Sequence, residues 1–108
     1  MSETENKTVN EQQQQANDYE QQMAQVTSYS IATSLVMVMA QKAWVNLGKI
    51  AADPKSNETK VDLPQAKFSI DVIAAVHELL KPHISAEESN QIQSLLTNLR
   101  LNYVSSSN

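Results

Sequence analysis

The polar side chains of this chain that could act together chemically are Lys67, Asp71, Arg100 and Tyr103. Lys67 and Asp71 are four residues apart, the spacing at which opposite charges pair on one face of a helix. A tight return of the chain would bring Arg100 and Tyr103 beside them. Because structural networks also gather such residues, we interpret the group as a structural polar cluster. The alternative is a binding role, in which Arg100 presents its fork of N–H donors to a carboxylate or to a partner chain.

Catalysis is the least favoured use of these residues. The chain has no cysteine, and it shows no nucleophile–base pair and no second carboxylate at a catalytic spacing. The two histidines, His77 and His83, are not the one-turn pair that presents two metal ligands on one helix face, and Pro82 separates them. His77 falls among apolar residues, which predicts a packed side chain at the edge of a core. We therefore expect no catalytic residue, no metal site, no cofactor and no enzymatic activity.

The composition is that of one small domain without a phosphate-binding loop. The chain has 108 residues and a single glycine, Gly48, whereas glycine-rich phosphate loops need several glycines. Residues 1–27 hold five acids and one base, which accounts for the net charge of −4, and the remainder holds seven acids and seven bases. A nucleic-acid-binding protein normally has a concentrated basic field. We find none and expect no nucleic-acid partner.

The most apolar segment, residues 27–50, would form a helix that is apolar on more than one side. A surface helix normally has one apolar stripe. This segment has two well-marked stripes, and a chain of this size has no large core in which to bury the second one. The first stripe contains Ile31, Leu35, Val38 and Val45, and the second contains Ala32, Val36, Met39, Ala43, Leu47 and Ile50.

The surplus apolar surface predicts a homo-oligomeric helical bundle assembled through this first helix, a dimer as the first choice and a higher bundle as the second. We predict a non-enzymatic, self-associating module that acts as a structural or adaptor component, with a further, unidentified protein as a possible partner. The alternative function is a helical bundle that holds a small molecule or a lipid near Met37, Met39 and Trp44. The residues predicted at the oligomer interface are Leu35, Val38, Met39, Trp44, Val45 and Leu47.

We do not expect this segment to span a membrane. The uncharged run from Gln21 to Gln41 has the length of a span, but its purely apolar part is only Leu35 to Ala40. The N-terminus also lacks the basic region, apolar run and cleavage site of a signal peptide. We therefore expect neither a spanning helix nor a signal peptide.

The expected fold class is all-α, with a long N-terminal apolar helix followed by an antiparallel helical hairpin. Residues 1–16 are acidic and rich in glutamine, a composition that predicts a disordered tail because it cannot bury enough apolar surface. Residues 17–104 form the predicted three-helix domain, with helices over about 20–51, 63–81 and 85–103. Residues 105–108 should fray.

The first two helix boundaries follow from local chemistry. The first helix should end near residues 50–52, because Asp53-Pro54 follows and a residue before proline is pushed away from helical geometry. Gly48 lies just ahead of that break, either in a loosened last turn or at a close helix contact. Asp62 and Pro64 are well placed to open the second helix.

The second helix has two stripes of its own, which again suggests one partner within the chain and one outside it. Pro82 should stop this helix. Ser85 and Glu88 form a capping box that opens the third helix. The short link between the two predicts an antiparallel hairpin. The first stripe, a heptad-like seam, contains Leu63, Ala66, Ile70, Ile73, His77 and Leu80, and the second stripe contains Phe68, Val72, Val76 and Leu79.

Four short motifs occur in a fixed order from the second helix onward. They are VDLPQAK at residues 61–67, Ile70-Asp71, SAEE at residues 85–88, and LRLNY at residues 99–103. In these motifs, and in a leading apolar helix that ends in Leu-Gly, the chain resembles the small bacterial family catalogued as domain of unknown function 1844, over residues 34–104. The family often has a longer Lys-Thr-Lys-Gly-Asn-Leu-like link where this chain has KPHI at residues 81–84. The resemblance implies the three-helix architecture and a bacterial cytoplasmic setting, and it implies no activity.

Overall fold

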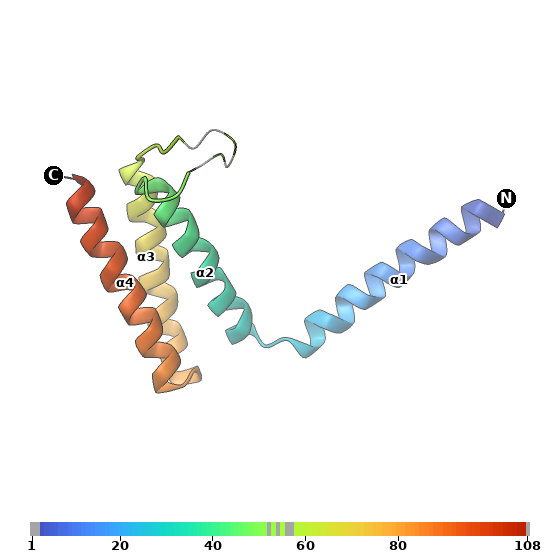
Figure 1. Cartoon of the computed structure of the whole chain (residues 1–108). Coiled ribbons are helices and arrows are strands. Elements are labelled where there is room, and N and C mark those ends of the chain that lie inside the picture. The colour runs from blue at the N-terminus through green and yellow to red at the C-terminus, as the bar shows by residue number, and fades with distance from the viewer. Residues whose placement is uncertain (1–2, 52, 54, 56–57, 108) are drawn as a thin grey trace. The chain divides into compact units, whose positions relative to one another are not determined.

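The computed structural model describes residues 3–51, 53, 55 and 58–107, without the side chains of residues 3–12 and 14. The described residues form four α-helices and no strand, which confirms the all-α prediction (Figure 1). The chain divides into two compact units, residues 1–31 and 32–108. The helices are α1 (Glu3–Gln25), α2 (Ser28–Asn46), α3 (Leu63–Leu80) and α4 (Ala86–Ser107), and a short 3₁₀ helix, η1 (Lys81–His83), follows α3.

Residues 1–16 were predicted to be disordered, but in the structure α1 runs from Glu3 to Gln25. Met1 and Ser2 lie outside the described residues. The run contains no glycine and no proline, and its glutamine, glutamate and alanine residues are good helix formers. All described side chains of α1 are exposed. Local helix propensity therefore accounts for this helix.

The prediction of one helix over residues 20–51 was wrong, because the segment forms two helices that break at Val26 and Thr27. The backbone N–H of Ser30 donates to Thr27 Oγ1 at 3.0 Å, so Thr27 is the N-cap of α2. A single threonine among glutamine and apolar residues was not recognised as a cap. The sequence signal was nevertheless present, since threonine is among the preferred capping residues.

Helix α2 also ends earlier than predicted, at Asn46, because Gly48 terminates it. Gly48 has a φ of 77°, a left-handed conformation that favours glycine. The Gly48 N–H donates to the Val45 carbonyl and the Lys49 N–H to the Trp44 carbonyl, both at 3.0 Å. These two bonds make a Schellman motif, which satisfies carbonyls that the helix end would leave unpaired. Gly48 is therefore the helix stop.

The end of α2 is joined to the start of α3 through the backbone. The Asp62 N–H donates to the Asn46 carbonyl at 2.8 Å, and Leu47 forms an isolated antiparallel bridge with Val61. The Asn46 side chain is buried, and its Oδ1 has no hydrogen-bond partner among the described residues. Backbone bonds, and not this side chain, therefore hold the junction.

The two hairpin helices begin with side-chain caps. Asp62 Oδ1 accepts from the Gln65 backbone N–H at 3.2 Å, and Asp62 Oδ2 accepts from Gln65 Nε2 at 2.9 Å. Ser85 Oγ accepts from the Glu88 N–H at 3.1 Å and lies 3.3 Å from Glu88 Oε1. Between the helices, η1 carries the chain past Pro82 to an extended residue, Ile84. Helices α3 and α4 then lie antiparallel and side by side (Figure 1).

One core joins α2, α3 and α4 into a three-helix unit. Between α3 and α4 the core also includes His77, which is buried and lies 2.9 Å from Ser89 Oγ through its Nε2 atom. The heptad-like stripe of the second helix supplies four of the buried apolar residues, and the rest come from α2, from Leu47 directly after it, and from α4. The buried apolar residues are Val36, Ala40, Ala43, Leu47, Ala66, Ile70, Ile73, Leu80, Ile92, Leu96 and Leu99.

Replacing Gly48 with alanine is expected to destabilise the three-helix unit by about 1–2 kcal/mol, because a residue with a Cβ is strained at positive φ. The new Cβ would also lie 3.0 Å from Val61 Cγ2. Chemical denaturation followed by circular dichroism measures the loss. Gly48→Asn is the control, because asparagine tolerates this conformation better. The loss of stability caused by Gly48→Ala is measured in the wild type and in a Val61→Ala background. The difference between the two losses is the part due to the contact with Val61. An alanine variant as stable as the wild type would contradict the assignment.

Candidate functional site

The structure brings the four predicted polar residues to one place, a hollow between α3 and α4. We call it the hairpin hollow, and its volume is about 330 Å³. The first turns of α3 and the last turns of α4 meet there because the helices are antiparallel. Its lining residues are Lys67, Ile70, Asp71, Arg100, Tyr103 and Val104.

The charges of the hairpin hollow are unevenly paired. Lys67 Nζ lies 2.9 Å from Asp71 Oδ2, and the pair is exposed, so it contributes little to stability. The hydrogen bond to Asp71, followed by the charge of that carboxylate, raises the pKa of Lys67 above its ordinary value. Within the described part of the chain, Arg100 has no hydrogen bond and no ion pair. One cation of the cluster is therefore paired and the other is not.

The residues predicted at the oligomer interface are only partly available at the surface. Leu35 and Val38 are 43% and 62% exposed, and Val45 is half-buried. Met39 and Trp44 are half-buried against the core. The prediction that Leu47 lies at the oligomer interface was wrong. Leu47 is only 2% exposed, because it lies on the same helix face as Val36 and Ala43 and is part of the chain's own core.

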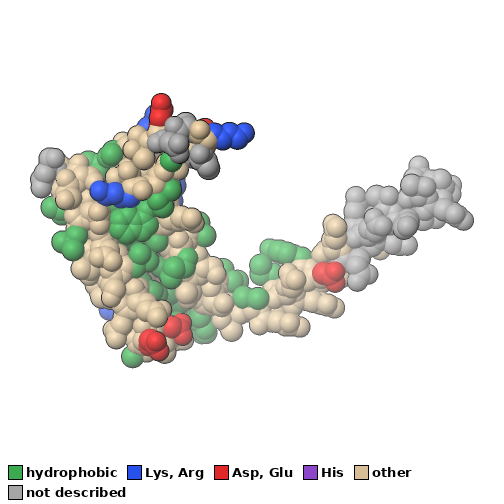
Figure 2. All heavy atoms as spheres, viewed as in Figure 1, with side chains coloured by type: hydrophobic (Ala, Val, Ile, Leu, Met, Phe, Trp, Pro, Cys, Tyr) green, Lys and Arg blue, Asp and Glu red, His purple; other side chains and the backbone are tan. Residues whose placement is uncertain are grey.

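The exposed side of α2 has a regular pattern, which we call the α2 seam. Its positions follow one another by four, three, four and three residues, a heptad-like spacing. Four are apolar and the fourth in order is a lysine. Hydrophobic side chains reach the surface of the unit formed by α2–α4 (Figure 2). The α2 seam consists of Ile31, Leu35, Val38, Lys42 and Val45.

Helix α3 has a second apolar row that is only partly turned away from the core, because Val76 packs against it. Phe68 and Leu79 are 66% and 75% exposed, while Val72 and Val76 are half-buried. This row is the second stripe that the sequence showed in this helix. The three-helix unit therefore exposes apolar rows on two of its helices.

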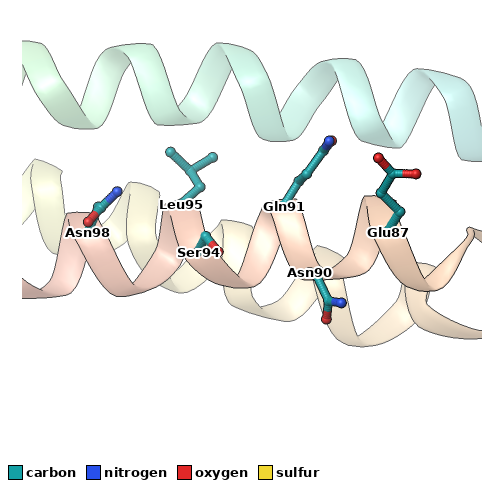
Figure 3. A pocket seen from close by; sticks show the side chains of 6 residues that line it. All are labelled: Glu87, Asn90, Gln91, Ser94, Leu95 and Asn98. Atoms are coloured by element: carbon teal, nitrogen blue, oxygen red, sulfur yellow. The ribbon is translucent and has the colours of Figure 1, made fainter.

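A broader hollow of about 760 Å³ runs along α4, and the sequence analysis did not identify it. Glu87, Gln91 and Leu95 point toward the helix drawn above them, which is α2 (Figure 3). The polar row at four- and three-residue steps along α4 was a signal that could have identified this face. The hollow is lined by amide and hydroxyl groups with one carboxylate, at Glu87, Asn90, Gln91, Ser94, Leu95 and Asn98.

The sequence analysis also considered an apolar ligand site, a metal site and a membrane span. Neither hollow is lined by Met37, Met39 or Trp44, and Met37 is exposed. Among the described residues, no three His, Asp or Glu side chains are grouped so that they could hold a metal ion. No single described helix is long and apolar enough to cross a membrane, although residues 15–25 and 28–46 reach that length and composition together across their break.

Comparison with known families finds one match that covers most of the chain. A family model described as "Domain of unknown function (DUF1844)" matches residues 28–105. The match begins at the first residue of α2 and ends within α4, so it covers the three-helix unit and leaves out α1. It confirms the resemblance seen in the sequence motifs. No curated protein and no solved structure matches the chain.

Replacing Asp71 with asparagine is expected to lower the pKa of Lys67 toward its ordinary value of 10.5, because Asp71 is the main cause of the increase. The raised pKa means that the wild-type pair stabilises the fold fully below pH 10.5 and that this contribution is lost as pH rises through the folded-state value. Side-chain NMR titration of Lys67 measures the shift. Glu78→Gln removes the carboxylate that pairs with Lys81, at the end of α3 opposite to Lys67, and should leave the Lys67 titration unchanged. An identical Lys67 titration in Asp71→Asn and wild type would show that Asp71 does not cause the raised pKa.

Proposed function

We propose, from the premise that the chain belongs to the DUF1844 family, that it is a non-enzymatic, self-associating helical module with a structural or adaptor role. The observation that carries this proposal is the exposure of the α2 seam. Assembly would use this seam, and the occupant would be a second copy of the chain.

The residues of the α2 seam are not part of the chain's own core. The opposite face of α2 supplies Val36, Ala40, Ala43 and Leu47 to that core, so α2 is already anchored. Single apolar residues at a protein surface need no explanation, but contiguous apolar patches mark interaction sites. A heptad-spaced row is, in addition, the pattern that a second helix packs against. The spacing therefore favours a helical occupant.

A second copy is the favoured occupant because the same seam can serve both partners. Most homo-oligomers are dimers with a two-fold axis, in which one patch meets the same patch of the other subunit. Such a contact needs no additional protein. The exposed row on α3, with Phe68 and Leu79, remains available for a higher bundle or for a different partner.

The charge of Lys42 favours an antiparallel pair of α2 helices. A parallel, in-register pair would place the two Lys42 side chains at the same level, and α2 contains no acidic residue to pair with them. An antiparallel pair centred between Leu35 and Val38 places Lys42 opposite Ile31 of the second copy. The two lysines are then eleven residues apart along the helix axis, or about 16 Å at the rise of an α-helix. That separation exceeds the screening length at physiological salt, about 8 Å.

Replacing Val38 with glutamate is expected to raise the dissociation constant of the homo-oligomer by about 100-fold or more. An unpaired carboxylate in an apolar contact costs several kcal/mol, and each 1.4 kcal/mol is a tenfold change. Sedimentation equilibrium on the full chain measures the change. Gln41→Glu is the matched control, because it adds the same charge at an exposed polar position of α2 outside the seam.

Two outcomes would contradict this proposal. One is a wild-type chain that stays monomeric at all concentrations tested. The other is a Val38→Glu variant that associates as strongly as Gln41→Glu. Circular dichroism establishes that both variants remain helical, since Val38 and Gln41 are exposed and neither is part of the core.

Cysteine cross-linking tests the orientation separately, because the chain has no cysteine of its own. We expect a mixture of the single variants Leu35→Cys and Val38→Cys to cross-link mainly between the two different variants. A parallel pair would instead cross-link each variant mainly to itself. Gel electrophoresis of tagged variants of two sizes distinguishes these products. Predominant same-variant products would refute the antiparallel arrangement while leaving self-association intact.

A further inference from the structure

The hairpin hollow has the size and the walls of a small-molecule site, independently of any self-association. Its volume of about 330 Å³ falls in the range of about 300–1,000 Å³ that is usual for ligand pockets. Ile70, which is almost fully buried, belongs to the core at its base. The half-buried Tyr103 packs against that core and lines the hollow as well. Apolar surface is therefore present next to the charged groups.

The charges around this hollow favour a single negative charge. Lys67 and Asp71 neutralise each other across a 2.9 Å contact. Arg100 has no such partner within the described part of the chain, so the three charged groups sum to one positive charge. Asp71 repels a second negative charge, which disfavours a dianion. A carboxylate supplies one charge only.

The donor geometry also favours a carboxylate. A guanidinium presents parallel N–H groups that match the two oxygens of a carboxylate. Tyr103 adds a hydroxyl, and no hydrogen bond to it is present among the described residues. A phenolic hydroxyl can donate to a carboxylate oxygen. Two kinds of donor thus adjoin one apolar surface.

We propose that the hairpin hollow binds a small carboxylate with an apolar body, with the guanidinium of Arg100 as the main partner of the carboxylate. The apolar body packs against Ile70 and the ring of Tyr103, and the Lys67–Asp71 pair forms the polar wall. Two sources have this chemistry: a free carboxylic acid and the C-terminal carboxylate of a peptide.

Titration of the full-length, ¹⁵N-labelled chain with hexanoate tests the proposal by NMR. We expect saturable shifts of the backbone amides around Ile70, Arg100 and Tyr103, with a dissociation constant of about 1 mM or lower. Hexanamide, which has the same apolar body without the charge, should not produce them. Inorganic phosphate should bind more weakly than hexanoate, because at neutral pH a large fraction of it is the dianion.

Variants of Arg100 separate a built site from general charge attraction. Arg100→Gln should abolish saturation, and Arg100→Lys should weaken binding about tenfold, because the charge remains and the fork is lost. Lys49→Gln removes one exposed positive charge from outside the hollow and is the matched control. It should bind as the wild type does. Because Arg100 is exposed, we expect the ligand-free amide spectrum of each variant to differ from the wild type only near the substituted residue.

A peptide ending in leucine, with a free or an amidated C-terminus, distinguishes the two sources. Binding of the free peptide at least about tenfold tighter than hexanoate identifies a peptide terminus, and equal or weaker binding identifies a free acid. The proposal is overturned if neither probe gives saturable shifts, if hexanamide shifts the same amides as hexanoate, or if Arg100→Gln binds as the wild type does. Tighter binding of phosphate would overturn the carboxylate assignment.

Discussion

The packing of one face of α2 on the α3–α4 hairpin is the interaction on which the rest of the structure depends. Val36, Ala40, Ala43 and Leu47 are buried in this contact. All four side chains are at most 5% exposed, so this face of α2 is fully used by the core. A helix can turn only one of its sides to a core. Burying this face therefore leaves the α2 seam at the surface, and the apolar character of that seam becomes a property of the folded unit.

The backbone junction at the end of α2 determines which residues can meet. Gly48 ends the helix, and the bond from the Asp62 N–H to the Asn46 carbonyl places the start of α3 beside that end. Helix α3 is then capped in place by Asp62, and the return through η1 sets α4 antiparallel to it. The first turns of α3 and the last turns of α4 consequently adjoin, which creates the hairpin hollow.

The two surfaces that result differ in chemistry and in position. The α2 seam is apolar apart from Lys42, and its spacing is suited to another helix. The hairpin hollow combines apolar walls with one unpaired cation, and it is formed by the other two helices. The family match covers both, since residues 28–105 include α2, α3 and most of α4. The proposed self-association and the proposed ligand binding are therefore testable by separate substitutions.

The sequence by itself determined those features that depend on neighbours along the chain. The caps at Asp62 and Ser85 and the apolar stripes could be predicted because each rests on contacts within a few residues. The Thr27 cap has the same local origin and was missed because threonine is common outside caps. Only the tertiary structure decided which stripe of each helix is buried: periodicity alone ranks both stripes of α2 equally, so Leu47 was expected at an interface and is in the core. The unpaired state of Arg100 was likewise decided by the hairpin, because it depends on the positions of side chains about thirty residues away in the chain.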